Sequence, residues 1–128
     1  MLPRIALIAC MLSSAGLQSR VAKAEDYTGM DLVQDCQAQA KDRFAFCMGY
    51  LRGMLNGMMA GQQAFQLGYV LCQPPGVTPL QLSLMVQKMA REQPAILNQD
   101  ALNVAGRPIL DAFRCKPGEK PNYGRLGQ

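Results

Sequence analysis

The sequence predicts an all-α fold: a small, disulfide-stapled bundle of about four helices in which the second helix is long and glycine-rich. Three observations favour this fold. Apolar residues recur at helical spacing along most of the chain, and no segment shows the alternation typical of a strand. Two short motifs have the form that begins a helix. Four cysteines flank the predicted helices and could join them in pairs.

Residues 1–24 have the pattern of a cleaved secretory signal peptide. Arg4 supplies a positive charge, an apolar stretch covers residues 5–17, and a small-x-small cleavage sequence follows at 22–24. A retained membrane anchor is the alternative, but the apolar stretch is shorter than the roughly 20 residues that a spanning helix needs. We therefore expect an exported chain that is not an integral membrane protein.

Removing this segment changes the composition. Three of the 13 Lys and Arg residues and one of the five cysteines, Cys10, lie in it, whereas all nine Asp and Glu residues follow it. The mature chain would carry a net charge of +1 and four cysteines. A nearly neutral chain without a basic cluster is a poor nucleic-acid binder. Because the sequence contains no histidine, it offers no imidazole base and no His-ligated metal site, and we expect neither an enzyme nor a cofactor or metal.

The first helix is predicted to begin at a capping box, in which the Thr28 hydroxyl accepts from the backbone N–H three residues later and Asp31 reaches back. It carries an apolar face that ends at Cys36. A polar connector at 41–43 then leads into the second helix.

The second helix is predicted over about residues 44–71. Its apolar stripe consists of Cys47, Tyr50, Leu51, Met54, Met58 and Phe65. A row of glycines at a strict interval of four, namely Gly49, Gly53, Gly57 and Gly61, costs the helix about 1 kcal/mol each relative to alanine. Transmembrane association is one interpretation of such a row. We favour close packing against another helix of a soluble domain, because Arg52 lies near the middle of the segment.

Two further helices follow a turn at 73–76, where two prolines and a glycine end the second helix. The third begins at the capping box of Thr78 and Gln81, with Pro79 at its first position, and runs to Pro94. The fourth is predicted over about 98–113, and the sequence Gly-Arg-Pro at 106–108 should kink or split it. Residues 25–115 then form the helical domain, and residues 116–128 should be a disordered tail.

The four remaining cysteines are predicted to form two disulfides by topology. If the first two helices make an antiparallel hairpin, Cys36 and Cys47 lie opposite each other; if the last two do likewise, Cys72 and Cys115 return to the same end. Redox catalysis or metal binding is the alternative use, but no Cys-x-x-Cys pair is present.

Several motifs in this order resemble the Rap/Tai group of small exported immunity proteins associated with type VI secretion. They are Cys36, the sequence Phe-Cys-Met-Gly-Tyr at 46–50 with Gly53, the sequence from Cys72 to Thr78, and the sequence Phe-Arg-Cys at 113–115. The similarity covers about residues 28–115. It implies a helical periplasmic protein, often a homodimer, that binds and neutralises a peptidoglycan-cleaving amidase effector.

A binding protein of this kind needs anchor residues for its partner. The candidates are the polar flank of the second helix and the turn that follows it, specifically Arg52, Asn56, Gln63, Gln73 and Thr78. The alternative function is a periplasmic chaperone-like or stress-related protein, which the six methionines at 48, 54, 58, 59, 85 and 89 would serve as an adaptable surface. Filling of the core is the simpler explanation of those methionines.

Overall fold

The computed structural model describes residues 26–65 and 70–123, and within them the fold is all-α as predicted. The helices are α1 (Gly29–Gln37), α2 (Lys41–Ala64), α3 (Pro79–Glu92), the short 3₁₀ helix η1 (Pro94–Asn98) and α4 (Ala101–Phe113). Residues 1–24, the predicted signal peptide, lie outside the described residues. None of the described helices combines the length and apolar character that a membrane-spanning helix requires.

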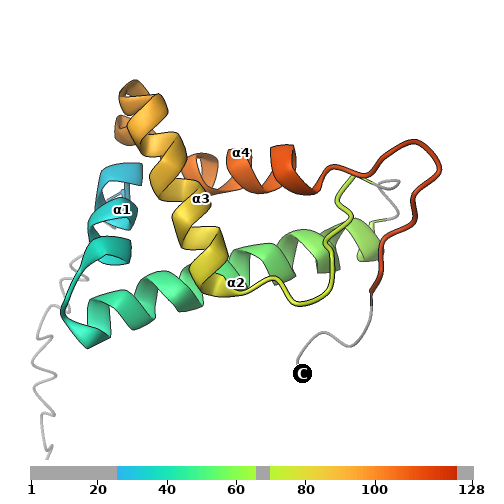
Figure 1. Cartoon of the computed structure of the whole chain (residues 1–128), viewed down its shortest axis with the longest axis horizontal. Coiled ribbons are helices and arrows are strands. Elements are labelled where there is room, and N and C mark those ends of the chain that lie inside the picture. The colour runs from blue at the N-terminus through green and yellow to red at the C-terminus, as the bar shows by residue number, and fades with distance from the viewer. Residues whose placement is uncertain (1–25, 66–69, 124–128) are drawn as a thin grey trace, which may run out of the picture.

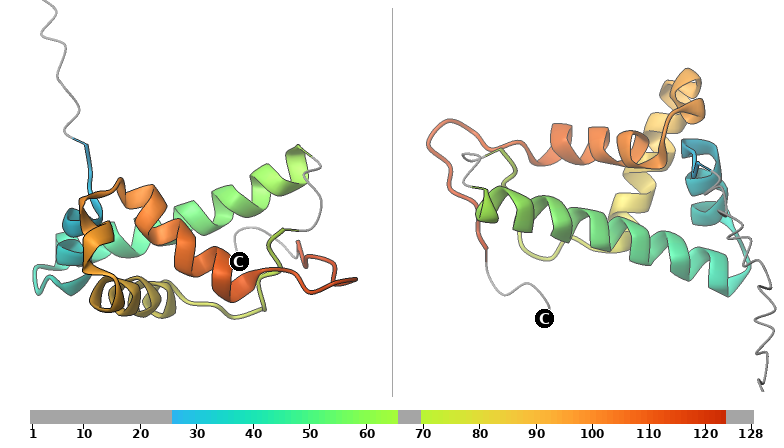
Figure 2. Two further views of the ribbon diagram at one scale, coloured as in Figure 1. Left: turned by 90° about the horizontal axis from the view of Figure 1, so that it is seen from above. Right: turned by 180° about the vertical axis from the view of Figure 1, so that it is seen from behind.

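Helix α2 runs along the long axis of the molecule, and α1, α3 and α4 all pack on one side of it (Figures 1 and 2). One apolar core lies between these helices. Its fully or almost fully buried side chains include Leu32, Leu51, Leu55, Leu71, Leu82, Val86, Val104 and Ile109. Because α2 contributes a residue to this core at almost every turn, it forms the base on which the other helices sit.

Both predicted capping boxes are present. The Thr28 hydroxyl accepts from the N–H of Asp31 while the Asp31 carboxylate accepts from the Thr28 N–H, and Thr78 and Gln81 do the same at the start of α3. Each box satisfies backbone donors that a helix N-terminus otherwise leaves without a partner. These local signals explain why the starts of α1 and α3 could be predicted to the residue.

Two expectations about the helices were wrong. Helix α2 runs from Lys41 to Ala64 instead of from about 44 to 71, so the chain turns at 38–40 and the polar residues 41–43 form the first turn of the helix. Helix α4 begins at Ala101 and is not split at residues 106–108, and Pro108 is buried inside the continuous helix. Proline within a helix removes one backbone hydrogen bond, but here its ring lies on the buried side of α4, beside Ile109 in sequence. Burial of apolar surface then offsets the lost bond.

Both disulfides join the cysteine pairs that the topology predicted. Cys36 is bonded to Cys47 across the α1–α2 hairpin, and Cys72 is bonded to Cys115 beyond the end of α4. Cys36, Cys47 and Cys72 are buried. The first bond ties α1 to the base helix, and the second ties the segment before α3 to the segment after α4.

Candidate partner-binding surface

The turn between α2 and α3, residues 73–78, is held in place at both of its ends. At its start, Cys72 is bonded to Cys115 and its N–H donates to the Phe113 carbonyl at 2.7 Å. At its end, the Arg52 Nη1 donates to the Val77 carbonyl at 3.1 Å. Within it, Gly76 has a φ of 82°, a conformation that side chains rarely adopt. The turn is therefore a braced surface feature.

Three of the five predicted anchor residues belong to this turn or support it. Gln73 lies in the turn, Thr78 ends it as the N-cap of α3, and Arg52 braces it from α2. Asn56 and Gln63 are also on α2, but neither lines the hollows beside the turn. Of the five residues, only Gln73 lines a hollow, Arg52 and Thr78 hold the two sides of the turn's end, and among the described residues no contact links Gln63 to the turn.

Two hollows lie beside the turn. The larger, of about 430 Å³, is lined by Cys72, Gln73, Pro74, Pro75, Ala112, Phe113, Arg114, Lys116, Glu119, Lys120 and Asn122. The smaller, of about 280 Å³, is lined by Pro74, Pro75, Gly76, Val77, Gln81, Met85 and Phe113. Both are lined by Pro74, Pro75 and Phe113, so they adjoin, and we call the two hollows together the groove.

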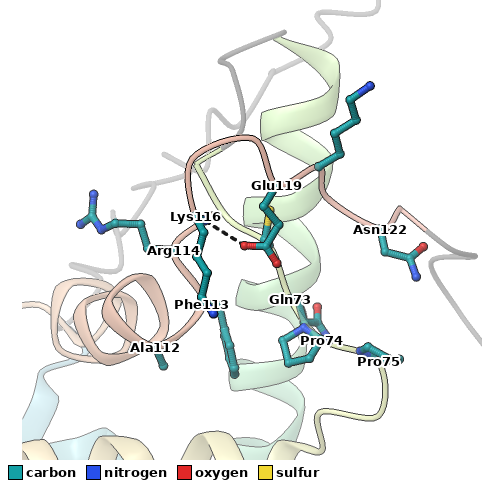
Figure 3. Close-up of a pocket in the computed structure, with 11 residues that line it drawn as sticks. Gln73, Pro74, Pro75, Ala112, Phe113, Arg114, Lys116, Glu119 and Asn122 are labelled. Atoms are coloured by element: carbon teal, nitrogen blue, oxygen red, sulfur yellow. Dashed lines mark hydrogen bonds between the residues drawn. The ribbon is translucent and has the colours of Figure 1, made fainter.

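Figure 3 shows the larger hollow, with Pro74 and Phe113 facing each other across it. The Arg114 side chain points away from these two residues. The Glu119 carboxylate accepts a hydrogen bond of 2.8 Å from the Lys116 N–H, which closes a tight turn. This part of the groove therefore combines an apolar floor with ionic groups near its edge.

The segment after Cys115 makes contacts that sequence reasoning missed. The Gln62 side chain, 6% exposed, donates to the Leu71 carbonyl at 3.1 Å and to the Tyr123 hydroxyl at 3.0 Å. Its Oε1 accepts from the N–H groups of Val70, at 2.9 Å, and Leu71, at 2.6 Å. Tyr123 also packs against the core. A signal was available, because Gln62 is the one polar member of a buried stripe at helical spacing.

The predicted close packing of the glycine row does not occur within the described part of the chain. A Cβ atom built on Gly49, Gly53, Gly57 or Gly61 would meet no other heavy atom within 4 Å. The row lies on the side of α2 opposite its buried residues, and three of the four glycines are exposed. The buried stripe of α2 is instead Cys47, Leu51, Leu55, Met59 and Gln62.

An aromatic cluster lies near the N-terminal ends of α1 and α2. The Tyr27 ring packs at 5.5 Å from the rings of both Phe46 and Tyr50. The Tyr27 hydroxyl donates to the Asp35 carboxylate at 2.7 Å, and Arg43 pairs with the same carboxylate at 2.6 Å. Burial, together with the bond to Asp35, raises the pKa of Tyr27, and burial raises that of Tyr50. Both phenols stay protonated at neutral pH. The cluster therefore stabilises the contact between the start of α1 and helix α2 by packing and hydrogen bonding.

Comparison with known proteins finds a match to one protein family. Neither the curated proteins nor the solved structures contained a match to the chain. The family model described as Rap1a immunity proteins matches residues 28–115, which extend from the N-cap of α1 to the second cysteine of the Cys72–Cys115 disulfide. The match thus covers all the described helices and both disulfides. The chain belongs to the family of Rap1a immunity proteins.

Proposed function

We propose that this protein is exported to the periplasm, where it binds and inhibits a peptidoglycan amidase effector delivered by type VI secretion. Membership of the immunity family carries this proposal, because immunity proteins act by binding an effector. The two disulfides support export, since such bonds persist in oxidising compartments like the periplasm. The braced turn and the groove beside it supply a rigid surface of the kind that specific inhibition requires.

The test uses the oxidised mature chain, residues 25–128, and the amidase that a neighbouring gene is expected to encode, called the adjacent amidase below. We expect stoichiometric inhibition of peptidoglycan hydrolysis and a saturable calorimetric titration. An unrelated amidase serves as the control and should be neither bound nor inhibited. Absence of both binding and inhibition with the adjacent amidase would refute the proposal.

The alternative of a chaperone-like protein depended on an adaptable methionine surface. In the fold, Met59 is 2% exposed, and Met48, Met54, Met58, Met85 and Met89 are partly buried against the core. Met59 fills the interior and the other five pack partly against it, so core packing explains these methionines better than a client-binding surface does.

We also propose that the protein forms a homodimer through the outward face of α2. Between residues 44 and 64 the sequence has a single charge, Arg52, and that side chain is bonded to Val77. The exposed residues of this face are Phe46, Gly49, Gly53, Gly57, Ala60 and Ala64. Two copies of an uncharged face can meet across a two-fold axis, whereas two copies of a strongly charged face would repel each other. Small residues at an interval of four would let two such helices approach closely.

Light scattering of Gly53→Arg and of a matched control, Gly106→Arg on α4, tests this dimer. A Cβ added to either glycine would meet no heavy atom within 4 Å, so both variants should fold. We expect Gly53→Arg to be monomeric and Gly106→Arg to keep the mass of the parent. A parent that is itself monomeric at about 100 μM would contradict the dimer.

A further inference from the structure

The groove has two chemically different halves. At the α3 end its lining is apolar, with Val77, Met85 and Phe113 beside the prolines of the turn. At the other end its lining includes Arg114, Lys116 and Lys120 against one carboxylate, that of Glu119. We propose that this groove receives an extended acidic segment of the partner protein, with an apolar side chain in the first half and a carboxylate in the second. This inference rests on the proposed function only for the identity of the partner.

The apolar half fits one side chain. Its volume of about 280 Å³ is at the lower limit of small-molecule pockets and suits a single aliphatic or aromatic anchor. The anchor would contact Pro75 and Phe113, which are shared with the larger hollow. A segment anchored there lies next to the charged half, so its neighbouring residues can reach it.

The charged half favours a carboxylate by its balance of charge. Lys116 and Lys120 line it with one anionic residue, Glu119, which already accepts a hydrogen bond from the backbone of Lys116, and the Arg114 side chain at its edge points away from Pro74 and Phe113. Glu119 is the one acidic residue in the lining, and Asp111 is the acidic residue nearest to it in sequence, one position before Ala112. An acidic segment would be steered to this end of the molecule and a basic one away from it.

The groove is preorganised by contacts that involve none of its charged side chains. Arg52 holds Val77, the Cys72–Cys115 disulfide joins the two walls, and Gln62 binds Tyr123 at the end of the segment that carries Lys116 and Lys120. A surface fixed in this way loses little conformational entropy when a segment binds. Charge variants at the rim can therefore be made without disturbing these braces.

The first experiment needs no effector. The capped peptide Ac-Leu-Gly-Asp-Glu-NH₂ is titrated to about 10 mM into the ¹⁵N-labelled mature chain, and its neutral analogue Ac-Leu-Gly-Asn-Gln-NH₂ serves as the control. We expect the acidic peptide to shift amide signals of Met85, residues 113–116 and Glu119, and to bind at least about 5-fold more tightly than the analogue. No shifts in the groove, or equal binding of both peptides, would overturn the proposal.

The second experiment uses the adjacent amidase with a pair of matched double variants. Lys116→Glu with Lys120→Glu changes the net charge as much as Lys41→Glu with Arg91→Glu, and all four positions are exposed. We expect the first pair to weaken binding about 30-fold at 0.1 M salt and much less at 1 M, because the Debye length falls from about 10 Å to about 3 Å. The second pair should change it less than about 3-fold. Equal effects would overturn the acidic assignment while leaving the inhibitory function intact.

The apolar half is tested by Met85→Gln against Leu84→Gln, its neighbour on α3, which is 56% exposed and does not line the groove. We expect about a 10-fold loss of affinity for the first and almost none for the second. If the parent chain binds no amidase at all, the proposed function fails, and the peptide titration alone decides on the groove.

Discussion

The Arg52 Nη1, on α2, donates a hydrogen bond of 3.1 Å to the carbonyl oxygen of Val77, which lies 25 residues further along the chain. Arg52 is half-buried and Val77 is buried. A residue that the sequence suggested as a partner anchor thus also supports the turn that precedes α3. Its effect on binding would be partly indirect, through the position of the turn.

We expect Arg52→Ala to lower the free energy of unfolding by about 1–2 kcal/mol, because a bond from a charged donor to a sheltered carbonyl is lost. Affinity for the amidase should fall as well, since the turn loosens. Urea denaturation and calorimetry measure the two effects. Gln63→Ala, an exposed change on the same helix, is the control and should stay within about 0.5 kcal/mol of the parent. Parent-like stability and affinity in Arg52→Ala would contradict the bracing role.

Gln62 is the second brace, and its loss should cost more. Replacing it with Leu leaves the N–H groups of Val70 and Leu71 without their acceptor. Leu71 is buried, and an unsatisfied buried donor costs about 1–3 kcal/mol, whereas the exposed Val70 can bond to water. Tyr123→Phe removes a single hydrogen bond to the same side chain and should cost about 1 kcal/mol. Chemical denaturation gives both values. Amide exchange at Leu71 should accelerate in Gln62→Leu only; similar rates in the two variants would show that the tyrosine is the main support.

The parts of the fold that could be predicted depend on local chemistry. The Thr28 and Thr78 capping boxes involve atoms three residues apart, so their outcome is set almost entirely by nearby sequence. The disulfide pairing followed from helix order, since chain reversal brings Cys36 to Cys47 and Cys72 to Cys115. Helix order is a coarse property, and a modest error in helix length leaves it unchanged.

The parts that could not be predicted depend on how helices are placed in three dimensions. The glycine row and the buried stripe of α2 both recur every three or four residues, so spacing alone does not say which of them faces the core. The braces from Gln62 to Tyr123 and from Arg52 to Val77 join residues 61 and 25 positions apart. Contacts of that kind exist only after the bundle has assembled.

The Cys72–Cys115 disulfide should contribute more stability than Cys36–Cys47, because it closes the longer loop. The paired cysteines are 43 and 11 positions apart, which corresponds to about 4 and about 3 kcal/mol in the chain-entropy model. We expect the double serine variants to lose stability in that order when measured by urea denaturation. The variant without Cys72 and Cys115 should also lose affinity for the amidase, since these residues join the two walls of the groove. A variant as stable and as tightly binding as the parent would contradict this role.

Acid should weaken the start of α1 through Asp31. Hydrogen bonds from the Thr28 hydroxyl, at 2.6 Å, and the Thr28 N–H, at 2.9 Å, hold the pKa of Asp31 below its usual value of 3.8. Since the folded-state pKa is the lower one, the stability that this carboxylate contributes is present above about pH 4. It is lost as the pH falls through the folded-state value.

We therefore expect the urea midpoint to fall between pH 5 and pH 2.5 less steeply in Asp31→Asn than in the parent. Carboxyl NMR titration of Thr28→Val should move the Asp31 pKa back toward 3.8, because the strongest donor is removed, whereas Thr28→Ser should keep it low. An unchanged pKa in Thr28→Val would assign the shift to another cause.

Replacing Gly29 or Gly53 with alanine should change the stability of the fold in opposite directions. A Cβ on Gly29 would lie 2.5 Å from a methyl carbon of Val104, which is fully buried, so α1 and α4 would have to separate. Overpacking of this kind costs about 1–3 kcal/mol. A Cβ on Gly53 would meet nothing within 4 Å, and there alanine should stabilise α2 by about 1 kcal/mol through helix propensity. Thermal denaturation at two protein concentrations tenfold apart separates this gain from any change in association. A destabilised Gly53→Ala monomer would mean that the outward face of α2 is covered within the chain.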